Sequence, residues 1–456
     1  PDGRGLPGLP LVRSPREVWL GGPVVSDVTA PGALLLGDNV AGGKRQPVAL
    51  PQEDRLRHVY VVGQTGTGKS TLLLNLIAQD LEAGLGLALL DPHGDLFRQI
   101  LARVPEARID DVVVVDPSDG ERPVGFNFLA CAPDERDQIV ESFLGLLYQL
   151  YDPYRQGIVG PRFEHGVRNA MHTAMANDGL TLVEVVRVLT DAAYVRTLLP
   201  RVTDPVVRRY WTDQIANTSD FHKSEVLDYV VSKFSNFVTN RLVRNIVGQS
   251  ASTFDQRQIM DEGKILLVNL AQGKLGQKMS AFLGSVIVPR ILMAALSRVD
   301  LPEEERRPFA LYVDEFQAYA TPAFVDIVSG ARKYGLSITM AHQHVAQLPG
   351  EVREAILGNV GTQLAMRVGV HDAALLAASM HPSAFGIEDY VELPNFRAIA
   401  RVLADGRHRP CFTLATRPMP PARGREWAEE VRERSRQRYG RPREVVEREI
   451  AARAGL

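Results

Sequence analysis

From His58 onward, short aliphatic runs alternate with longer stretches that have helical length and apolar spacing. This pattern predicts β-strands at 58–62, 85–91, 111–117, 264–270, 309–315, 337–342, 362–369, 396–403 and 411–416. Helices are predicted between several of these strands, notably over 71–81 and 278–297. Strands that are apolar along their whole length are typical of a parallel sheet covered by helices on both faces. The pattern therefore predicts an α/β fold with a mostly parallel sheet.

The alternation stops between about residues 132 and 247. This region has no strong β run, and its apolar positions follow a helical period over 134–151, 181–190 and 223–238. We therefore expect an all-α insertion within the α/β fold. Lys223, Lys233, Arg241 and Arg244 lie near Phe234 and Phe237, and we expect a solvated face over a buried Phe stripe there.

Composition narrows the class of protein. The chain has 456 residues, is 45% hydrophobic and 23% charged, and carries a formal net charge of -2, as ordinary soluble proteins do. No overall basic field indicates a nucleic-acid partner, so any such contact needs local patches. Cys131 and Cys411 are too far apart in sequence to suggest a disulfide framework or a zinc site, and they fit a reducing cytoplasm.

One segment comes close to the composition of a membrane span. Residues 281–296 are apolar but contain Pro289 and Arg290, so we expect a buried helix. The chain begins with Pro1 and not with Met, and we expect it to start within a longer protein. A membrane region is expected only in such an upstream part.

The segment GQTGTGKST matches the phosphate-binding P-loop pattern G-x-x-x-x-G-K-[ST]. It follows a predicted buried strand and opens a predicted helix, which is the context that this pattern requires. Glycines let backbone N–H groups surround phosphates, Lys69 would neutralise β- and γ-phosphate oxygens, and the Ser70 hydroxyl would ligate Mg²⁺. The cofactors are thus ATP and Mg²⁺, with nucleotide-binding residues Gly63, Gln64, Thr65, Gly66, Thr67, Gly68, Lys69, Ser70 and Thr71.

Two acids end the predicted strand FALYV. Carboxyl ends of parallel strands meet at the edge of the sheet where ligands collect. Asp314 is expected to hold Mg²⁺, and Glu315 to act as the general base that polarises the attacking water. An acid directly after this Asp argues against nucleotide kinases and small GTPases, and no LSGGQ-like segment suggests an ABC transporter.

Three further segments carry a family resemblance: DPHGDL at 91–96, IMDEGKILLVNLAQGKLG at 259–276 and GARKYGLSITMAHQ at 330–343. Together with the P-loop they resemble the HerA–FtsK class of pumping ATPases. More narrowly, they look like the conjugative coupling proteins of type IV secretion, the TraG/TraD group. The resemblance covers about residues 55–416 and implies a RecA-like P-loop NTPase fold that carries its all-α insertion in this place.

The resemblance suggests roles for four more residues. Arg332 matches an arginine finger that reaches the γ-phosphate in a neighbouring subunit; the alternative is a cation at a helix end before Gly335. Gln343 matches a polar residue that senses the γ-phosphate or holds water; the alternative is a surface Gln. Asp91 is expected to support the nucleotide site without an assigned chemistry. Arg367 is either a further sensor or an ordinary strand-end ion pair.

The implied organisation has four parts. Residues 1–54 form a leader or small β appendage, with β-like runs at 17–20 and 33–36. The RecA-like ATPase motor comprises 55–131 and 248–416, and the all-α insertion 132–247. A charged helical tail occupies 417–456; its Arg- and Glu-rich sequence from 421 onward predicts a solvated helix.

The predicted function is a ring-forming, ATP-driven DNA-translocating motor, a hexamer of this chain. Its expected partners are DNA and the relaxase or secretion-channel proteins, and its expected location is the cytoplasm, at the inner face of the membrane where an upstream anchor exists. One alternative is a type IV secretion ATPase that moves protein. A second is a soluble HerA-like DNA helicase partnered with a nuclease, and a third is a scaffold that binds ATP without turnover.

Overall fold

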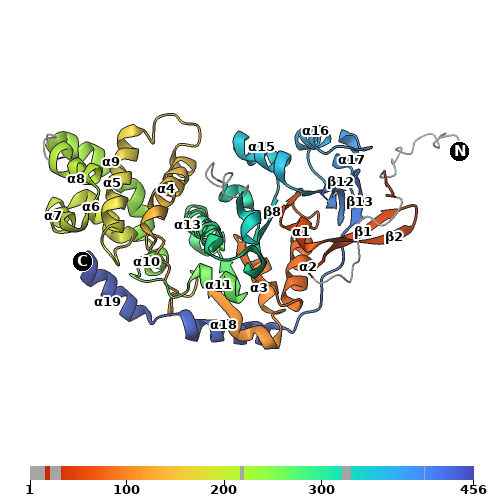
Figure 1. Ribbon diagram of the computed structural model, residues 1–456, viewed down its shortest axis with the longest axis horizontal. Coiled ribbons are helices and arrows are strands. Elements are labelled where there is room, and N and C mark those ends of the chain that lie inside the picture. Colours follow the sequence, from red (N-terminus) through yellow and green to blue (C-terminus); the bar gives the residue numbers. More distant parts are fainter. Residues whose placement is uncertain (1–15, 21–31, 216–219, 321–329, 405, 456) are drawn as a thin grey trace. The chain divides into compact units, whose positions relative to one another are not determined.

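The structure is a computed structural model that describes residues 16–20, 32–215, 220–320, 330–404 and 406–455 (Figure 1). Its contacts divide the chain into two compact units. The first comprises Pro1–Leu76, Ala341–Gln347 and Val360–Met419, and the second comprises Ile77–Met340, Leu348–Asn359 and Pro420–Leu456. The four domains predicted from the sequence stay a prediction.

The first unit contains six strands in the order β2-β1-β13-β10-β9-β3. Only β3 and β9 pair in parallel, with Val59 opposite Thr362; the other neighbours are antiparallel. The unit also contains a short β11–β12 pair and the helices α1, α16 and α17. The bounds are β1 Leu34–Ala41, β2 Lys44–Leu50, β3 Val59–Val62, β9 Thr362–Ala365, β10 Arg397–Arg401, β11 Leu403–Ala404, β12 Arg407–His408, β13 Phe412–Ala415, α1 Gln52–Arg55, α16 Val370–Ser379 and α17 Ile387–Val391.

The β-like run at 33–36 is confirmed as the start of β1, but the run at 17–20 has no regular secondary structure. Its Val18 N–H donates to the side-chain Oγ1 of Thr413 over 3.1 Å, and Asn39 Nδ2 donates to the Val18 carbonyl over 3.0 Å. Side chains of β13 and β1 supply most of these bonds, and one backbone bond, from the Thr413 N–H to the Val18 carbonyl over 3.4 Å, joins them. The strand predicted at 17–20 is therefore wrong.

The second unit contains the parallel strands β8-β7-β4-β6-β5. Their bounds are β4 Gly86–Asp91, β5 Val112–Val115, β6 Ile265–Asn269, β7 Phe309–Val313 and β8 Leu336–His342, whose last two residues belong to the first unit. Every residue of these strands is buried, which explains their unbroken apolar sequences. The register sets Leu90 opposite Val313 and Asp91 opposite Asn269, so the carboxyl ends of β4, β6 and β7 are level. The predicted α/β fold with a mostly parallel sheet is confirmed.

Helices flank these strands. Helix α2, Lys69–Glu82, begins in the first unit and ends in the second. The second unit also contains α3 Asp95–Leu101, α11 Gln256–Glu262, α12 Gln272–Leu275, α13 Gln277–Leu296 and α15 Gly350–Asn359. Short 3₁₀ turns occur between them, of which 106–111, 297–300 and 332–334 matter below.

Among the described residues from 136 to 247, all regular structure is helical. The α-helices are α4 Arg136–Tyr151, α5 Pro161–Met175, α6 Leu182–Thr190, α7 Ala192–Leu198, α8 Pro205–Arg209, α9 Asp220–Thr239 and α10 Arg241–Val247. Phe234 and Phe237 are fully buried, and Phe237 stacks on Phe282 of α13 with ring centroids 4.3 Å apart. The predicted Phe stripe is confirmed, while the side chain of Lys223 lies outside those that the structure describes.

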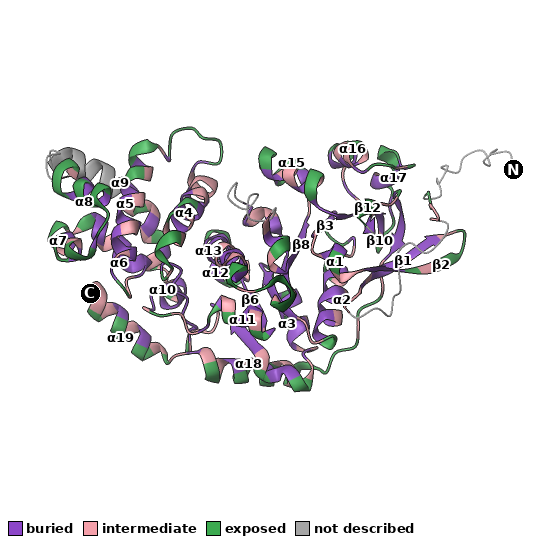
Figure 2. Cartoon of the chain, in the orientation of Figure 1, coloured by how far each residue is buried: buried purple, intermediate pink, exposed green. Residues whose placement is uncertain are grey.

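Helix α13 is the apolar segment that came closest to a membrane span. The stretch from 277 to 300 is long and apolar enough to cross a membrane, but 83% of its most apolar window is buried inside the protein. Figure 2 shows α13 mostly in the purple of buried residues. The prediction of a buried helix is confirmed.

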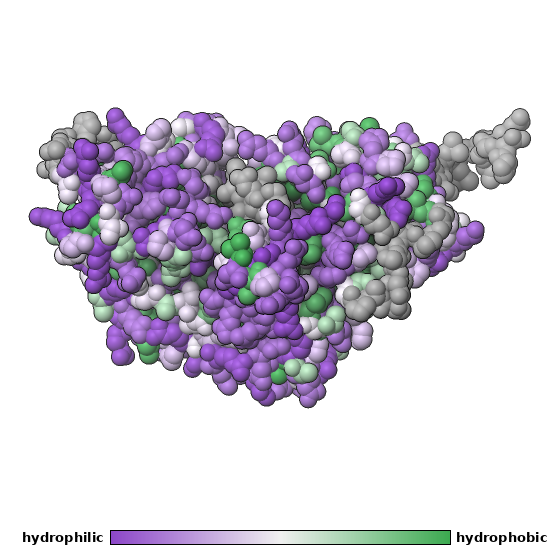
Figure 3. Space-filling view, in the orientation of Figure 1, coloured by the Kyte–Doolittle hydropathy of each residue, from purple (hydrophilic) through white to green (hydrophobic). Residues whose placement is uncertain are grey.

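The C-terminal tail is helical, as predicted, but one face of it packs on the protein, so the expectation of a solvated helix is wrong. It forms α18 Arg425–Tyr439 and α19 Arg443–Ala454, which bury Val431, Ser435, Val446 and Ile450. Hydrophilic side chains dominate the lower part of the face shown in Figure 3, where Figure 1 places α18. The charge pattern misled the prediction because ion pairs to distant acids attach this tail to the second unit, as the following contacts show.

Helix α18 lies along the outer strand β5. The Val114 N–H donates to Ser435 Oγ over 2.8 Å, so a hydroxyl on the helix satisfies a backbone donor of the strand. Arg432 pairs with Asp116 over 2.8 Å, and Arg436 pairs with Asp119 over 2.7 Å. The tail therefore completes the edge of the sheet.

Candidate functional site

The loop from Gly63 to Thr71 joins the end of β3 to the start of α2, as the sequence predicts. Gly66 and Gly68 have φ values of 78° and 111°, which side chains with a Cβ rarely adopt. Lys69 is 7% exposed, and its Nζ donates to the carbonyls of Gly63 over 2.6 Å and Gln64 over 3.2 Å. The loop thus folds round the ammonium group at the N-terminal end of a helix, where anions are stabilised.

Residues of other strands in the same unit support this loop. Thr65 Oγ1 donates to Gln343 Oε1 over 3.0 Å, so the structure brings Gln343 to the P-loop. The Gly63 N–H donates to the His342 carbonyl over 3.2 Å, and the Gln64 N–H donates to the Arg367 carbonyl over 2.8 Å. The ends of β8 and β9 therefore fix the start of the loop.

Phe396 is a contact of the loop that the sequence did not reveal. Its N–H donates to the Thr67 carbonyl over 2.8 Å, and its ring lies so close to Gly68 that an added Cβ would meet ring carbon Cδ1 at 2.7 Å. Phe396 is 49% exposed and has a φ of 63°. Phe396 is distant from the loop in sequence, so only the structure, in which the start of β10 lies near the loop, reveals this contact.

Arg367 forms no ion pair with the residues that the structure describes, but its side chain has hydrogen-bond partners. Its guanidinium donates to the Leu393 carbonyl over 3.2 Å and to Asn395 Oδ1 over 2.8 Å. It therefore holds the segment just before Phe396. The strand-end ion pair considered from the sequence is not what the structure has.

Three acids gather at the carboxyl ends of β4 and β7 in the second unit. Asp91 is fully buried; its Oδ1 accepts from the His93 N–H and its Oδ2 from the Phe97 N–H, both over 2.8 Å. These two bonds satisfy backbone donors at the start of α3. The structure thus gives Asp91 a role that the sequence left open, namely holding the DPHGDL turn.

The two acids after β7 are also buried. Burial, with Asp91 and Glu315 nearby, raises the pKa of Asp314 to about 7. Glu315 adopts the left-handed conformation, with φ 48° and ψ 48°, which costs a non-glycine residue about 1–3 kcal/mol. Its Oε2 accepts from Gln317 Nε2 over 2.7 Å. A buried, strained carboxylate is typical of a functional position.

His93 is a second contact that sequence reasoning missed, although its motif was noted. Its Nε2 lies 3.7 Å from Glu315 Oε1, and its side chain is 51% exposed. The interaction with the Glu315 carboxylate raises the pKa of His93, and the charges of Asp314 and Asp91 act in the same direction. The sequence signal that could have identified it is a histidine in the turn between a strand and a helix.

Arg332 begins the 3₁₀ turn 332–334 and is exposed. No hydrogen bond or ion pair of its side chain occurs within the part of the chain that the structure describes. The predicted site residues thus form two groups, one in each unit. The first unit brings together the P-loop and Gln343, and the second brings together Asp91, Asp314 and Glu315.

Two family models match the sequence. One is described as the central domain of helicase HerA and matches residues 36–142; the other is described as the TraM recognition site of TraD and TraG and matches 308–380. The resemblance to the HerA–FtsK class and to coupling proteins is confirmed. No curated protein matches the chain in sequence.

Solved structures agree with the family models on the fold. The plasmid coupling protein TrwB in complex with the ATP analogue ADPNP is 18% identical, with a TM-score of 0.63 over 91% of this chain and 97% of that one. This chain has the RecA-like P-loop NTPase fold. The conjugative coupling protein TrwBdeltaN70 is 17% identical, with a TM-score of 0.61 over 83% of this chain and 88% of that one. VirB4 of Thermoanaerobacter pseudethanolicus is 14% identical, with a TM-score of 0.56 over 89% and 99%. The RecA-like fold predicted from the sequence is therefore confirmed.

Proposed function

We propose that this chain is one subunit of a hexameric ring that hydrolyses ATP to translocate DNA in a conjugation or type IV secretion system. The observation that carries the ATPase assignment is the buried Lys69 ammonium at the start of α2, enclosed by a loop that needs glycine at 66 and 68. The coupling protein TrwB is described in complexes with ADPNP and with ADP and Mg²⁺, which supports ATP and Mg²⁺ as the ligands here.

The residues fit both ligands. An added Cβ at position 68 would clash with the Phe396 ring, whereas one at Gly66 would meet no atom within 4 Å, so the loop backbone at Gly66 borders open space in which phosphate oxygens fit. Asp314 is a buried carboxyl beside two other acids, and a divalent cation would favour its ionised form. From their positions in the sequence motifs we assign Mg²⁺ binding to Ser70 and Asp314. When bound, Mg²⁺ neutralises charge on β- and γ-phosphate oxygens.

Each of the remaining site residues has its own role in hydrolysis. Lys69 binds the β- and γ-phosphates, and the loop from Gly63 to Thr71 holds them through its N–H groups. Glu315 accepts a proton from the attacking water, and Gln317 and His93 orient its carboxylate. Gln343, tied to the loop through Thr65, positions the water or senses the γ-phosphate. Arg332 stabilises the developing charge in the neighbouring subunit's site.

Ring formation and cargo rest on the relatives. The matches to the HerA domain, to the TraD and TraG region and to TrwB favour a DNA motor that works with relaxase and channel proteins. Its location would be the cytoplasm, at the inner face of the membrane if an anchor precedes this chain. The similarity to VirB4 favours a second candidate, a type IV secretion ATPase that moves protein.

The test of the cargo measures ATP turnover of assembled rings with linear duplex, with single strands and without DNA, at low and moderate salt. Phosphate contacts release counterions, so binding to duplex should weaken with a slope of about -0.9 per contacted phosphate in a log–log plot. Stimulation that fades as salt rises supports the DNA motor. Absence of both stimulation and DNA binding at low salt transfers the assignment to the protein-secretion candidate.

The test of the chemistry compares two variants. Lys69→Ala should lose nucleotide binding, whereas Glu315→Gln should bind ATP and turn it over at least ~10²-fold more slowly, as expected for loss of a general base. Near-normal turnover by Glu315→Gln would contradict its role.

A further inference from the structure

The side chain of Arg332 is exposed, but hydrogen bonds hold the backbone of the turn that carries it. The Gly335 N–H donates to the Arg332 carbonyl over 3.1 Å, and the Phe309 N–H of β7 donates to the Gly335 carbonyl over 2.9 Å. Gly335 has a φ of 74°, and a Cβ there would approach the Arg306 carbonyl to 3.2 Å. Both ends of the turn are thus fixed by backbone bonds.

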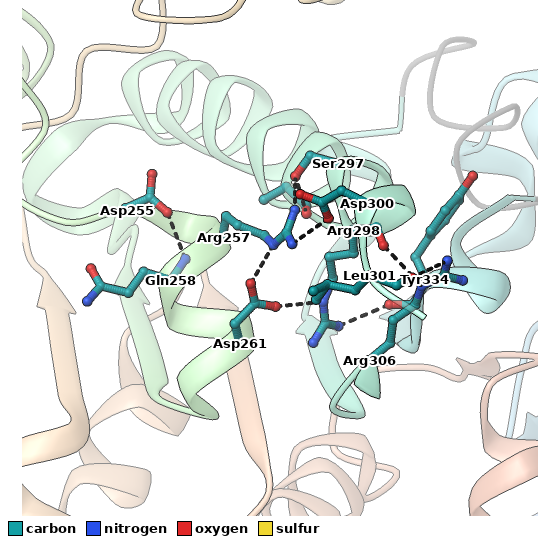
Figure 4. A network of polar contacts seen from close by, with 11 residues as sticks. Asp255, Arg257, Gln258, Asp261, Ser297, Arg298, Asp300, Leu301, Arg306 and Tyr334 are labelled. Carbon is teal, nitrogen blue, oxygen red and sulfur yellow. Dashed lines mark hydrogen bonds and ion pairs between the residues drawn. The ribbon is translucent and has the colours of Figure 1, made fainter. Parts of the chain in front are cut away.

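Two arginines from the 297–306 segment fix the middle of the turn (Figure 4). Arg298 is completely buried, and its NH1 donates to the Tyr334 carbonyl over 3.0 Å. Arg306 donates from NH1 to the Lys333 carbonyl over 2.5 Å, and its guanidinium lies 5.2 Å from the centre of the Tyr334 ring. The four consecutive carbonyls from Arg332 to Gly335 therefore each accept a hydrogen bond.

The two arginines are themselves tied together. Arg306 Nε donates to the Arg298 and Leu301 carbonyls, each over 3.0 Å. Arg298 Nε donates to Asp261 Oδ1 over 2.9 Å, and Arg257 Nε pairs with Asp261 Oδ2 over 2.5 Å. Figure 4 shows this chain of contacts passing from α11 to the turn. Asp261 thus supplies the negative charge without which a buried guanidinium would be very costly.

Burial of Arg298 stabilises the fold only weakly, since well-packed apolar residues often do as well as buried ion pairs. What a planar guanidinium adds is direction: it holds an acid and a backbone carbonyl in one fixed geometry. Here that carbonyl lies two residues after Arg332, whose own side chain has no partner in the described part of the chain. A rigid backbone beneath a charged side chain that has no partner among the described residues suits a group that acts on another molecule.

We propose that Arg298 and Arg306 are positioning residues that hold Arg332 in the geometry needed to reach an ATP phosphate in the neighbouring subunit. This inference rests on the proposed function, in which Arg332 acts as that finger. A displacement of about 1 Å can cost ~10²-fold in rate, so loss of the anchors should lower kcat by about 10- to 100-fold. KM for ATP should change little, because neither arginine belongs to the proposed nucleotide-binding residues.

The experiment uses the full chain as assembled rings with the variants Arg298→Lys, Arg306→Gln and Arg332→Ala, and both anchor variants combined with Arg332→Ala. The matched control is Arg108→Lys. Like Arg298, Arg108 is buried and pairs with an acid, Asp111, and its guanidinium donates to backbone carbonyls, those of Leu85 and Gly263, but its turn carries no proposed site residue. Thermal unfolding and nucleotide affinity are measured beside kcat and KM.

Arg332→Ala should be slow, and each anchor variant should lower kcat at unchanged nucleotide affinity. In the Arg332→Ala background the anchor changes should cause no further loss, because their effect passes through Arg332. Arg108→Lys should lose stability but keep its kcat. Should Arg298→Lys fail to fold, the more exposed Arg306→Gln decides alone.

Three results would overturn the inference. Normal kcat in both anchor variants, with Arg332→Ala slow, removes the positioning role and leaves the finger in place. Losses that multiply with that of Arg332→Ala, or an equal loss of kcat in Arg108→Lys, show a merely structural role. Normal turnover by Arg332→Ala removes the finger itself, and the positioning role with it.

Discussion

Arg453, near the C-terminal end of α19, donates from Nε to the carboxylate of Glu184, a completely buried side chain of α6, over 2.8 Å. The other oxygen of Glu184 accepts from the N–H and hydroxyl of Thr181, over 2.8 and 2.7 Å, and so caps α6. A single acid therefore serves both the start of a helix in the all-α region and the tail. The tail is part of the fold and not an appendage to it.

Arg453→Ala should destabilise the protein by about 3 kcal/mol, because it leaves a buried carboxylate without its charge partner. Arg448→Ala is the matched control, since Arg448 is an exposed arginine of the same helix and surface substitutions usually change stability by less than ~0.5 kcal/mol. Urea unfolding measures both. Equal losses in the two variants would contradict the role of the Glu184 pair.

Asp314 should make the nucleotide-free protein less stable as pH rises. Its carboxyl binds a proton more tightly in the folded chain, with a pKa of about 7, than in the unfolded chain, where 3.8 is usual. Stability from this group is therefore lost between those two values, at up to ~1.4 kcal/mol per pH unit. Asp314→Asn has no such proton and should flatten the slope between pH 5 and 7, measured without Mg²⁺. Glu304→Gln, an exposed acid, should leave it unchanged.

The backbone of Glu315 predicts an inverted order of stability for two small replacements. Glu315→Gly should be more stable than Glu315→Ala by about 1 kcal/mol, because only glycine adopts φ 48° without strain. At Glu430 in α18 the order should be the usual one, with Ala more stable than Gly by about 1 kcal/mol. Denaturant midpoints of the four variants give the comparison. Ala above Gly at 315 would exclude stored strain there.

Mixed assemblies test whether Arg332 acts between subunits. Lys69→Ala has a dead nucleotide site and an intact finger, and Arg332→Ala has the reverse. Mixing them should restore part of the ATPase activity, because fingers supplied in trans are worth ~10³-fold or more. Cross-linking or native mass measurement confirms that mixed rings form. Rings that form without any recovered activity would place Arg332 in its own subunit's site or outside the chemistry.

The sequence predicted those elements whose cause is local. The P-loop was found because its residues are contiguous and their context, a buried strand before and a helix after, can be read from spacing. Asp314 and Glu315 were found because acids that end an apolar strand lie at the ligand edge of a parallel sheet. Buried strands such as Val112–Val115 were found because their apolar runs are unbroken.

What escaped prediction depends on partners far away in the chain. Phe396 borders Gly68 only because β10 and β9 bring it there, and Asp91 caps α3 through a turn whose shape no spacing predicts. The tail looked solvated because its arginines are abundant, whereas Arg432 and Arg436 have acids more than 300 residues earlier as partners. A local charge pattern does not reveal whether a charged side chain pairs with an acid far away in the sequence, so it does not by itself predict exposure.

The contact between Ser435 and Val114 has a consequence for the solubility of the protein. Strand β5 consists of four consecutive valines at the end of the strand order of its unit, which is the composition of a strand that recruits other strands. Helix α18 covers this strand and occupies one of its free backbone donors. A truncation before Arg425, or a protease cut in the segment that leads to it, would expose the edge of β5 to pairing with strands of other molecules. The tail thus protects the protein from aggregation. Versions that lack the tail should form insoluble material even where their nucleotide site is intact.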